Sequence, residues 1–173
     1  MARTIFLVSS IFLFAQLSWA TPAEDLAHNG RVTDAAVVLF QDGKSADALT
    51  YLRTNLRPEP GSGVTTTEVA LVQQLAEVSG RFYNQRQLAL AQGAAQQALI
   101  EAEPILKGTC AVPSPRKASL YSSLGLLSET VLLDLESAQV LYEAAASLEP
   151  SDPLNNARKR GVAEKLRRKA GGR

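Results

Sequence analysis

The side chains that most often do chemistry in proteins are scarce in this sequence. Cys110 is the sole cysteine and His28 the sole histidine. A cysteine becomes reactive when a base or a positive charge nearby lowers its pKa, and no histidine stands near Cys110 in the sequence. We therefore interpret Cys110 as a buried or tolerated thiol, with a redox-active or intermolecularly paired thiol as the alternative. One histidine cannot build a metal site, so we interpret His28 as a surface residue.

Two carboxylate pairs, Glu101/Glu103 and Asp134/Glu136, are the remaining candidates for acid–base chemistry. Their members are two residues apart, which on a helix directs the side chains to different faces and leaves them solvated. The sequence also contains no glycine-rich phosphate loop and no serine in a strand–turn–helix elbow. We therefore expect no enzyme, no cofactor and no metal. An enzyme remains the alternative if the fold brings an Asp or Glu together with other groups.

The first twenty residues have the composition of a signal peptide. Arg3 supplies the positive region, residues 5–17 form an uncharged apolar core, and Ser18 and Ala20 are small residues at the positions that a signal peptidase reads. The apolar run is too short for a membrane span, which needs about 20 residues. We predict cleavage after Ala20 and export, to the periplasm or cell envelope if the source is bacterial and otherwise as a secreted protein.

The charge of the remaining chain is balanced in number but not in distribution. Beyond residue 20 there are 17 basic and 17 acidic residues, which argues against a nucleic-acid partner. Residues 21–150 carry 9 basic and 15 acidic side chains, whereas residues 151–173 carry 8 basic and 2 acidic ones. We expect one domain over residues 21–150, followed by a basic helix and tail over 151–173.

A repeat organises the first of these two regions. The pair Glu-Pro recurs at 59–60, 103–104 and 149–150, each time after a run rich in alanine and leucine. The prolines are 44 and 46 residues apart, which is the length of a helical hairpin. Strand-type alternation is missing, so the sequence predicts an all-α fold.

Helical periodicity and start signals place two helices in each repeat. A turn at Asp42-Gly43-Lys44 separates the first pair, and Ser45 is interpreted as a cap. Thr65 and Glu68 offer a capping box, and Ser114-Pro115 opens a third unit. The expected helices are 32–41, 45–56, 65–78, 86–103, 114–131 and about 138–145.

At these residues the chain resembles the tetratricopeptide repeat family. The segment Gly43 to Leu49 followed by Pro60 matches the family's turn glycine, packing alanine and terminal proline. The second unit carries Phe82, Ala91 and Ala98, and the third carries Tyr121, Leu124, Gly125, Ala138, Tyr142, Ala145 and Pro150. The resemblance implies a right-handed solenoid of about three antiparallel helical hairpins. An irregular bundle of amphipathic helices is the alternative.

The resemblance also implies a function. Proteins of this family are non-catalytic scaffolds or adaptors that bind a peptide or helix in a groove lined by the first helix of each hairpin. Carried over position by position, that groove consists of Val37, Phe40, Gln73, Tyr83, Asn84, Ser122, Leu126 and Glu129. Phe40 and Tyr83 could instead belong to the core between repeats. The positions that clamp a terminal carboxylate in other repeats lack a positive charge or an amide here, so that mode is not expected.

The basic region 151–173 supports two interpretations. Asp152-Pro153 is a helix start, and the following apolar residues could cover the last hairpin as a capping helix. The alternative is an envelope protein whose basic residues dock on an anionic membrane or polymer. The residues for that contact are Arg158, Lys159, Arg160, Arg167, Arg168 and Lys169.

Overall fold

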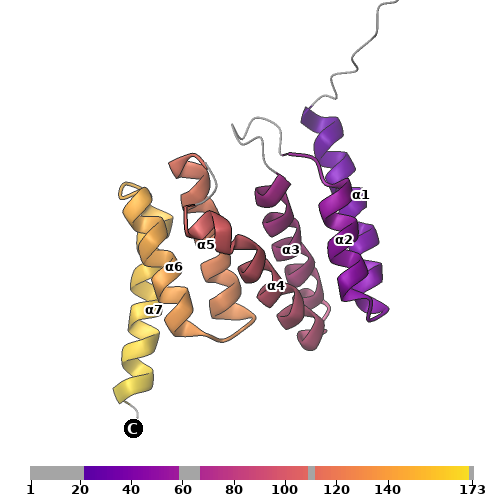
Figure 1. Cartoon of the computed structure of the whole chain (residues 1–173). Helices are drawn as coiled ribbons and strands as arrows, with labels where there is room; N and C mark the ends of the chain where they lie inside the picture. Colours follow the sequence, from indigo (N-terminus) through magenta and orange to yellow (C-terminus); the bar gives the residue numbers. More distant parts are fainter. Residues whose placement is uncertain (1–21, 59–66, 109–111, 172–173) are drawn as a thin grey trace, which may run out of the picture.

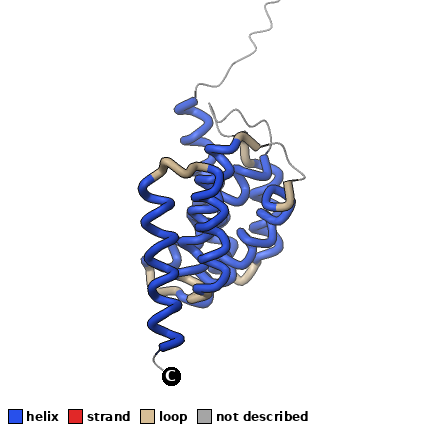
Figure 2. Tube along the Cα trace, turned by 90° about the vertical axis from the view of Figure 1, so that its left-hand side faces the viewer, coloured by secondary structure: helices blue, strands red, loops and turns tan. Residues whose placement is uncertain are grey.

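The computed structural model describes residues 22–58, 67–108 and 112–171, and within these ranges the chain is helical with short connections and no strand (Figures 1 and 2). The expected all-α fold of three hairpins and a terminal helix is confirmed. The helices are α1 (Pro22–Gln41), α2 (Ser45–Asn55), α3 (Thr67–Asn84), α4 (Leu88–Leu106), α5 (Ser114–Thr130), α6 (Leu135–Leu148) and α7 (Pro153–Gly171).

The helices stack as hairpins along one direction. Helices α1 and α2, α3 and α4, and α5 and α6 pack as pairs, and α7 packs against α6 (Figure 1). Neighbouring pairs meet at the first helix of the following hairpin: α1 and α2 both contact α3, and α3 and α4 both contact α5. We call the side formed by α1, α3, α5 and α7 the first-helix face, and the side formed by α2, α4 and α6 the second-helix face.

Small residues set the distance between paired helices. Ala48, Ala91 and Ala138, one in the second helix of each hairpin, are completely buried. A methyl side chain allows two helix axes to approach closely, so that hairpin can stack on hairpin around a continuous core. The three alanines interpreted from the sequence as packing positions are thus all buried, and their role in close helix approach stays a prediction.

Helix α1 is longer than expected. It begins at Pro22 rather than near residue 32, so the polar stretch His28-Asn29-Gly30 lies inside it. The reason is a set of contacts with the end of α2. The side chain of Asn29 accepts a hydrogen bond from the backbone N–H of Arg57 at 3.0 Å and donates one to the carbonyl of Arg57 at 3.0 Å. Nε2 of His28 lies 2.8 Å from the carbonyl oxygen of Asn55.

Helix α4 passes through Pro104, where the repeat pattern predicted a helix end. It continues to Leu106 because Ala102 and Ile105, on either side of the proline, are both fully buried. Proline has no N–H, so its presence removes one backbone hydrogen bond from this part of the helix. The turn then closes through the N–H of Lys107, which donates to the carbonyl of Glu103 at 2.9 Å, and Gly108 adopts a φ of 77°.

The starts of α6 and α7 are stabilised by acidic residues that the sequence signals only partly revealed. Asp134 is the N-cap of α6, and its carboxylate accepts hydrogen bonds from the N–H and the hydroxyl of Ser137 at 3.0 and 2.6 Å. These bonds lower the pKa of Asp134. Asp152 accepts from the N–H of Leu154 at 2.8 Å, at the start expected for α7. Ser45 is the first residue of α2 and makes no capping bond.

Candidate functional site

A pocket of 370 Å³ opens on the first-helix face between α3 and α5. It lies where the second hairpin meets the third, and α7 closes it on one side. The lining residues are Ala76, Gly80, Tyr83 and Asn84 from α3, Ser123, Leu126, Leu127 and Thr130 from α5, Val131 beyond it, and Arg158 from α7.

Three of the groove residues expected from the sequence come together in this pocket. Tyr83 is 43 % exposed and Leu126 40 % exposed, and Asn84 beside them is exposed as well. Two large side chains on neighbouring helices therefore present apolar surface to solvent at a concave site. Val37 in α1 and Gln73 in α3 are half-buried and do not line the pocket.

Two expected groove residues lie in the interior, and their assignment is corrected. Phe40 is only 3 % exposed and its ring stands edge-on to that of Phe82, with 6.3 Å between the ring centroids. Ser122 is 5 % exposed, and its hydroxyl accepts a hydrogen bond from Nη1 of Arg158 at 2.5 Å. Both positions face the neighbouring helix instead of the solvent, so neither can contact a partner in this conformation.

Glu129 is also engaged within the protein. Its carboxylate accepts hydrogen bonds from the hydroxyl of Tyr142 at 2.8 Å and from Nζ of Lys165 at 2.6 Å. Burial alone would raise the pKa of Glu129, but the bonds from Lys165 and Tyr142, together with the charge of Arg158, lower it below its usual value. The residue ties α5 to α6 and α7.

The basic residues of α7 divide into two groups. Arg158, expected on a surface-binding patch, is half-buried against Ser122 and forms part of the pocket wall, which corrects that assignment. Arg168 is exposed and pairs with Glu164 at 2.5 Å. The remaining members of the expected patch are exposed on α7, namely Lys159, Arg160, Arg167 and Lys169.

Neither a cluster of metal ligands nor a helix able to span a membrane is found among the described residues. Within residues 22–58, 67–108 and 112–171, no three His, Cys, Asp or Glu side chains lie close enough together to hold a metal ion. None of the helices in these ranges has the length and apolar character needed to cross a membrane. Cys110, Pro60, the first half of the expected capping box and the whole expected signal peptide lie outside the described residues.

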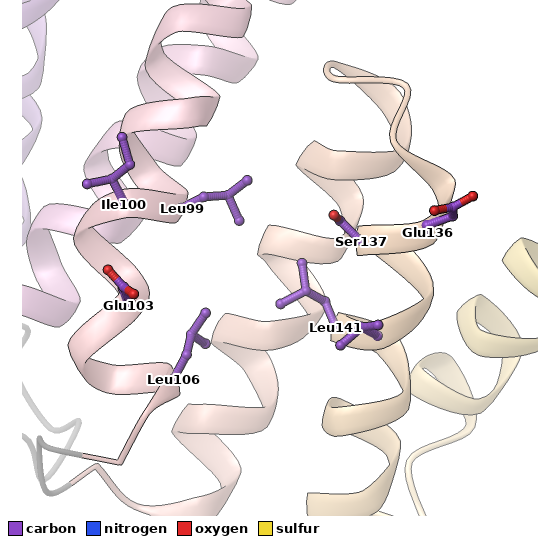
Figure 3. Close-up of a pocket in the computed structure, with 8 residues that line it drawn as sticks. Leu99, Ile100, Glu103, Leu106, Glu136, Ser137 and Leu141 are labelled. Atoms are coloured by element: carbon purple, nitrogen blue, oxygen red, sulfur yellow. The ribbon is translucent and has the colours of Figure 1, made fainter.

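A larger pocket of 590 Å³, which the sequence did not indicate, lies on the opposite side between α4 and α6 (Figure 3). Its most exposed apolar members are Ile100, 60 % exposed, and Val140, 66 % exposed. A large apolar side chain on the solvent side of each of two successive second helices was the available signal. Whether two such side chains line one groove depends on the distance between α4 and α6, and that distance is set by the stacking of the hairpins.

Stacked antiparallel hairpins with buried alanine in each second helix make this fold a tetratricopeptide-like all-α solenoid. No protein-family model matches the chain, and neither does any curated protein. Among solved structures, the chain is similar to the first TPR domain of Spaghetti (RPAP3) bound to the HSP90 peptide SRMEEVD. The two are 17 % identical with a TM-score of 0.41, and the match covers 81 % of this chain and 94 % of that one.

Proposed function

We propose that this protein is a non-catalytic interaction scaffold that binds a peptide or helix of a partner protein in the pocket between α3 and α5. The observation that carries the proposal is the pair Tyr83 and Leu126, which expose apolar surface in one concave site on neighbouring hairpins. Surfaces of this kind bind through a few large anchors that fill a pocket. The repeated hairpin supplies the rigid frame that holds the two residues at a fixed separation.

The polar groups of the pocket define which partner fits. Asn84 and Ser123 can donate to or accept from the backbone of a bound segment. The hydroxyl of Thr130 donates to the carbonyl of Leu126 and can still accept. Arg158 adds a positive charge at the side formed by α7. A segment with one or two apolar anchors and exposed backbone or acidic oxygens therefore complements the site.

A displayed library of random peptides tests this proposal directly. Peptides selected on the wild-type protein should lose at least about fivefold in affinity for Tyr83→Ala or Leu126→Ala, because each change removes one anchor. Leu88→Ala is the matched control, since Leu88 is 55 % exposed but lies outside the pocket. Selected peptides that bind the Tyr83 and Leu126 variants as well as they bind wild type would rule the pocket out.

Export is part of the same proposal and rests on the first twenty residues alone. The mass and N-terminal sequence of the protein isolated from its source should correspond to a chain that begins at Thr21 and should be found in the periplasmic, envelope or secreted fraction. Protein recovered from the cytoplasm with Met1 intact would contradict it.

A second candidate function is the docking of α7 on an anionic surface. Lys159, Arg160, Arg167 and Lys169 are exposed, and none of them forms an ion pair with another described residue. Such a surface should bind vesicles that contain anionic lipid and lose them as salt rises, because screening shortens to about 8 Å at physiological ionic strength. Replacing these four residues with Gln should abolish vesicle binding while peptide binding to the α3–α5 pocket persists. Vesicle binding that ignores salt, or survives the four changes, would exclude this function.

A further inference from the structure

The pocket between α4 and α6 is an open groove with apolar walls on the second-helix face. Figure 3 shows Leu99, Ile100 and Leu106 along the α4 side and Ser137 and Leu141 along the α6 side. Leu141 is buried and forms part of the floor, whereas Ile100 and Val140 are more than half exposed at the rim. The groove shares no lining residue with the pocket on the first-helix face.

The charge of this groove is acidic. Neither α4 nor α6 contains a lysine or arginine, and together they carry Glu101, Glu103, Glu136 and Glu143. Glu103 and Glu136 line the groove itself. Glu103 also pairs with Lys107, whereas Glu136 forms no ion pair with another described residue, although Lys169 lines a neighbouring pocket with it. A ligand in this groove therefore meets apolar side chains from both helices, with one glutamate on the α4 side and one on the α6 side.

The length of the groove fits a short helix. From Leu99 to Leu106 the wall of α4 covers about two helical turns, or roughly 10 Å at 1.5 Å per residue. An amphipathic helix places apolar residues at i, i+3 or i+4, and i+7 over the same distance. Such a helix could set its apolar stripe between α4 and α6 and direct its flanking residues toward Glu103 and Glu136.

We propose that this groove docks an amphipathic, basic helix of a partner protein, at a surface distinct from the peptide pocket on the first-helix face. The charge complementarity of Glu103 and Glu136 selects flanking Lys or Arg on that helix. The chain's own basic helix is a poor occupant in a second copy. Its buried apolar residue, Val162, already packs with Ala138 and Tyr142 of α6. Leu154, at the start of α7, is the one large apolar side chain that it exposes, and the exposed residues from 158 to 169 are mostly basic. Because the two faces use different helices, both could be occupied at once.

Two labelled synthetic peptides provide the test. The first is a helical peptide of about 15 residues with Leu at i, i+4 and i+7 and Lys at the flanking positions, and the second replaces each Lys with Glu. Fluorescence anisotropy should show binding of the lysine peptide and at least about tenfold weaker binding of the glutamate peptide. The double variant Ile100→Ala/Val140→Ala should lose at least about tenfold for the lysine peptide, because it removes both exposed rim anchors.

Two further variants separate this groove from the pocket on the other face. Glu103→Gln/Glu136→Gln should remove most of the preference for the lysine peptide over the glutamate peptide. Tyr83→Ala should leave lysine-peptide affinity unchanged, so that failure of the α3–α5 pocket and failure of this groove give different results. The substituted side chains are solvent-exposed, and unchanged circular dichroism and melting would verify that each variant is folded.

Three outcomes would overturn the proposal. The first is absence of lysine-peptide binding at about 1 mM peptide, and the second is equal affinity for the two peptides. The third is a wild-type dimer in light scattering that Ile100→Ala/Val140→Ala converts to a monomer, because the occupant would then be a second copy.

Discussion

Gly125 in α5 lies directly against the aromatic ring of Tyr142 in α6. A β-carbon built on Gly125 would come within 2.7 Å of Cε1 and 2.8 Å of Cδ1 of that ring. The ring is fully buried, and its hydroxyl is held by Glu129 at 2.8 Å, so it has little freedom to move away. The absence of a side chain at position 125 is therefore what allows α5 and α6 to pair at this distance.

Gly125→Ala should destabilise the protein by about 1–3 kcal/mol, because the added methyl group must displace a fixed ring in a packed interior. Chemical denaturation of the two proteins would measure the difference. Gly93→Ala in α4 is the matched control, since nothing lies within 4 Å of a β-carbon there. That change should stabilise the protein by about 0.5–1 kcal/mol, the usual preference for alanine within a helix. Equal effects of the two substitutions would contradict the close approach.

The carboxylate of Glu129 should make the free energy of unfolding depend on pH in the acidic range. Its pKa in the folded protein is lowered below the ordinary 4.5, so the unfolded chain takes up the proton first as pH falls. The stabilisation is therefore complete above about pH 4.5 and is lost as pH falls through the lower folded pKa. Urea unfolding between pH 6 and pH 2 should show Glu129→Gln to be less stable than wild type at pH 6, and this difference should shrink in acid.

Tyr142→Phe isolates one part of that acid dependence. It removes the hydroxyl that donates to Glu129 but retains the bond from Lys165. The pH slope of this variant should lie between those of wild type and Glu129→Gln, and its stability at pH 6 should be lower by about 1 kcal/mol. A slope identical to that of wild type would show that Tyr142 does not influence the ionisation of Glu129.

Both the NH₂ group and the oxygen of the Asn29 side chain should contribute to stability. Asn29→Asp keeps the size of the side chain and the acceptor for the N–H of Arg57 but removes the donor to the carbonyl of Arg57. Asn29 is 3 % exposed, so the loss should cost about 1–3 kcal/mol in the free energy of unfolding. Thermal melting would measure this cost at neutral pH. An unchanged melting temperature would show that the link between α1 and the end of α2 contributes nothing to stability.

Ala138, which packs with Tyr142 of α6 and Val162 of α7, offers a test of how tightly α6 is packed. Ala138→Leu should overpack this fully buried site and cost about 1–3 kcal/mol. Ala157→Leu, at an exposed position of α7, should change stability by less than about 0.5 kcal/mol. If Ala138→Leu melts like the parent protein, the third hairpin does not require a small residue at this crossing.

Structural features set by a few consecutive residues could be predicted from the sequence, whereas features that depend on contacts between helices could not. The turn at Asp42-Gly43-Lys44 and the helix starts near Ser114 and Pro153 are set within a few residues of the chain. They could therefore be read from residue types. The helix end predicted at Pro104 was wrong because the burial of Ala102 and Ile105 keeps the chain helical on both sides of the proline. The predicted start of α1 was too late because Asn29, in a polar stretch, forms hydrogen bonds with Arg57 just beyond α2.

The sequence by itself determined the all-α class, the three hairpins, and the alanines that allow helices to pair, because helical periodicity and small residues at crossings repeat along the chain. Tertiary structure alone decided which expected groove residues reach solvent. Tyr83 and Leu126 line a pocket, whereas Phe40 and Ser122 are covered by neighbouring elements. It also brought Arg158 from α7 into the pocket and set Ile100 and Val140 on one groove. The physical reason is that exposure and juxtaposition between helices distant in sequence depend on the stacking angle and spacing, which no local pattern encodes.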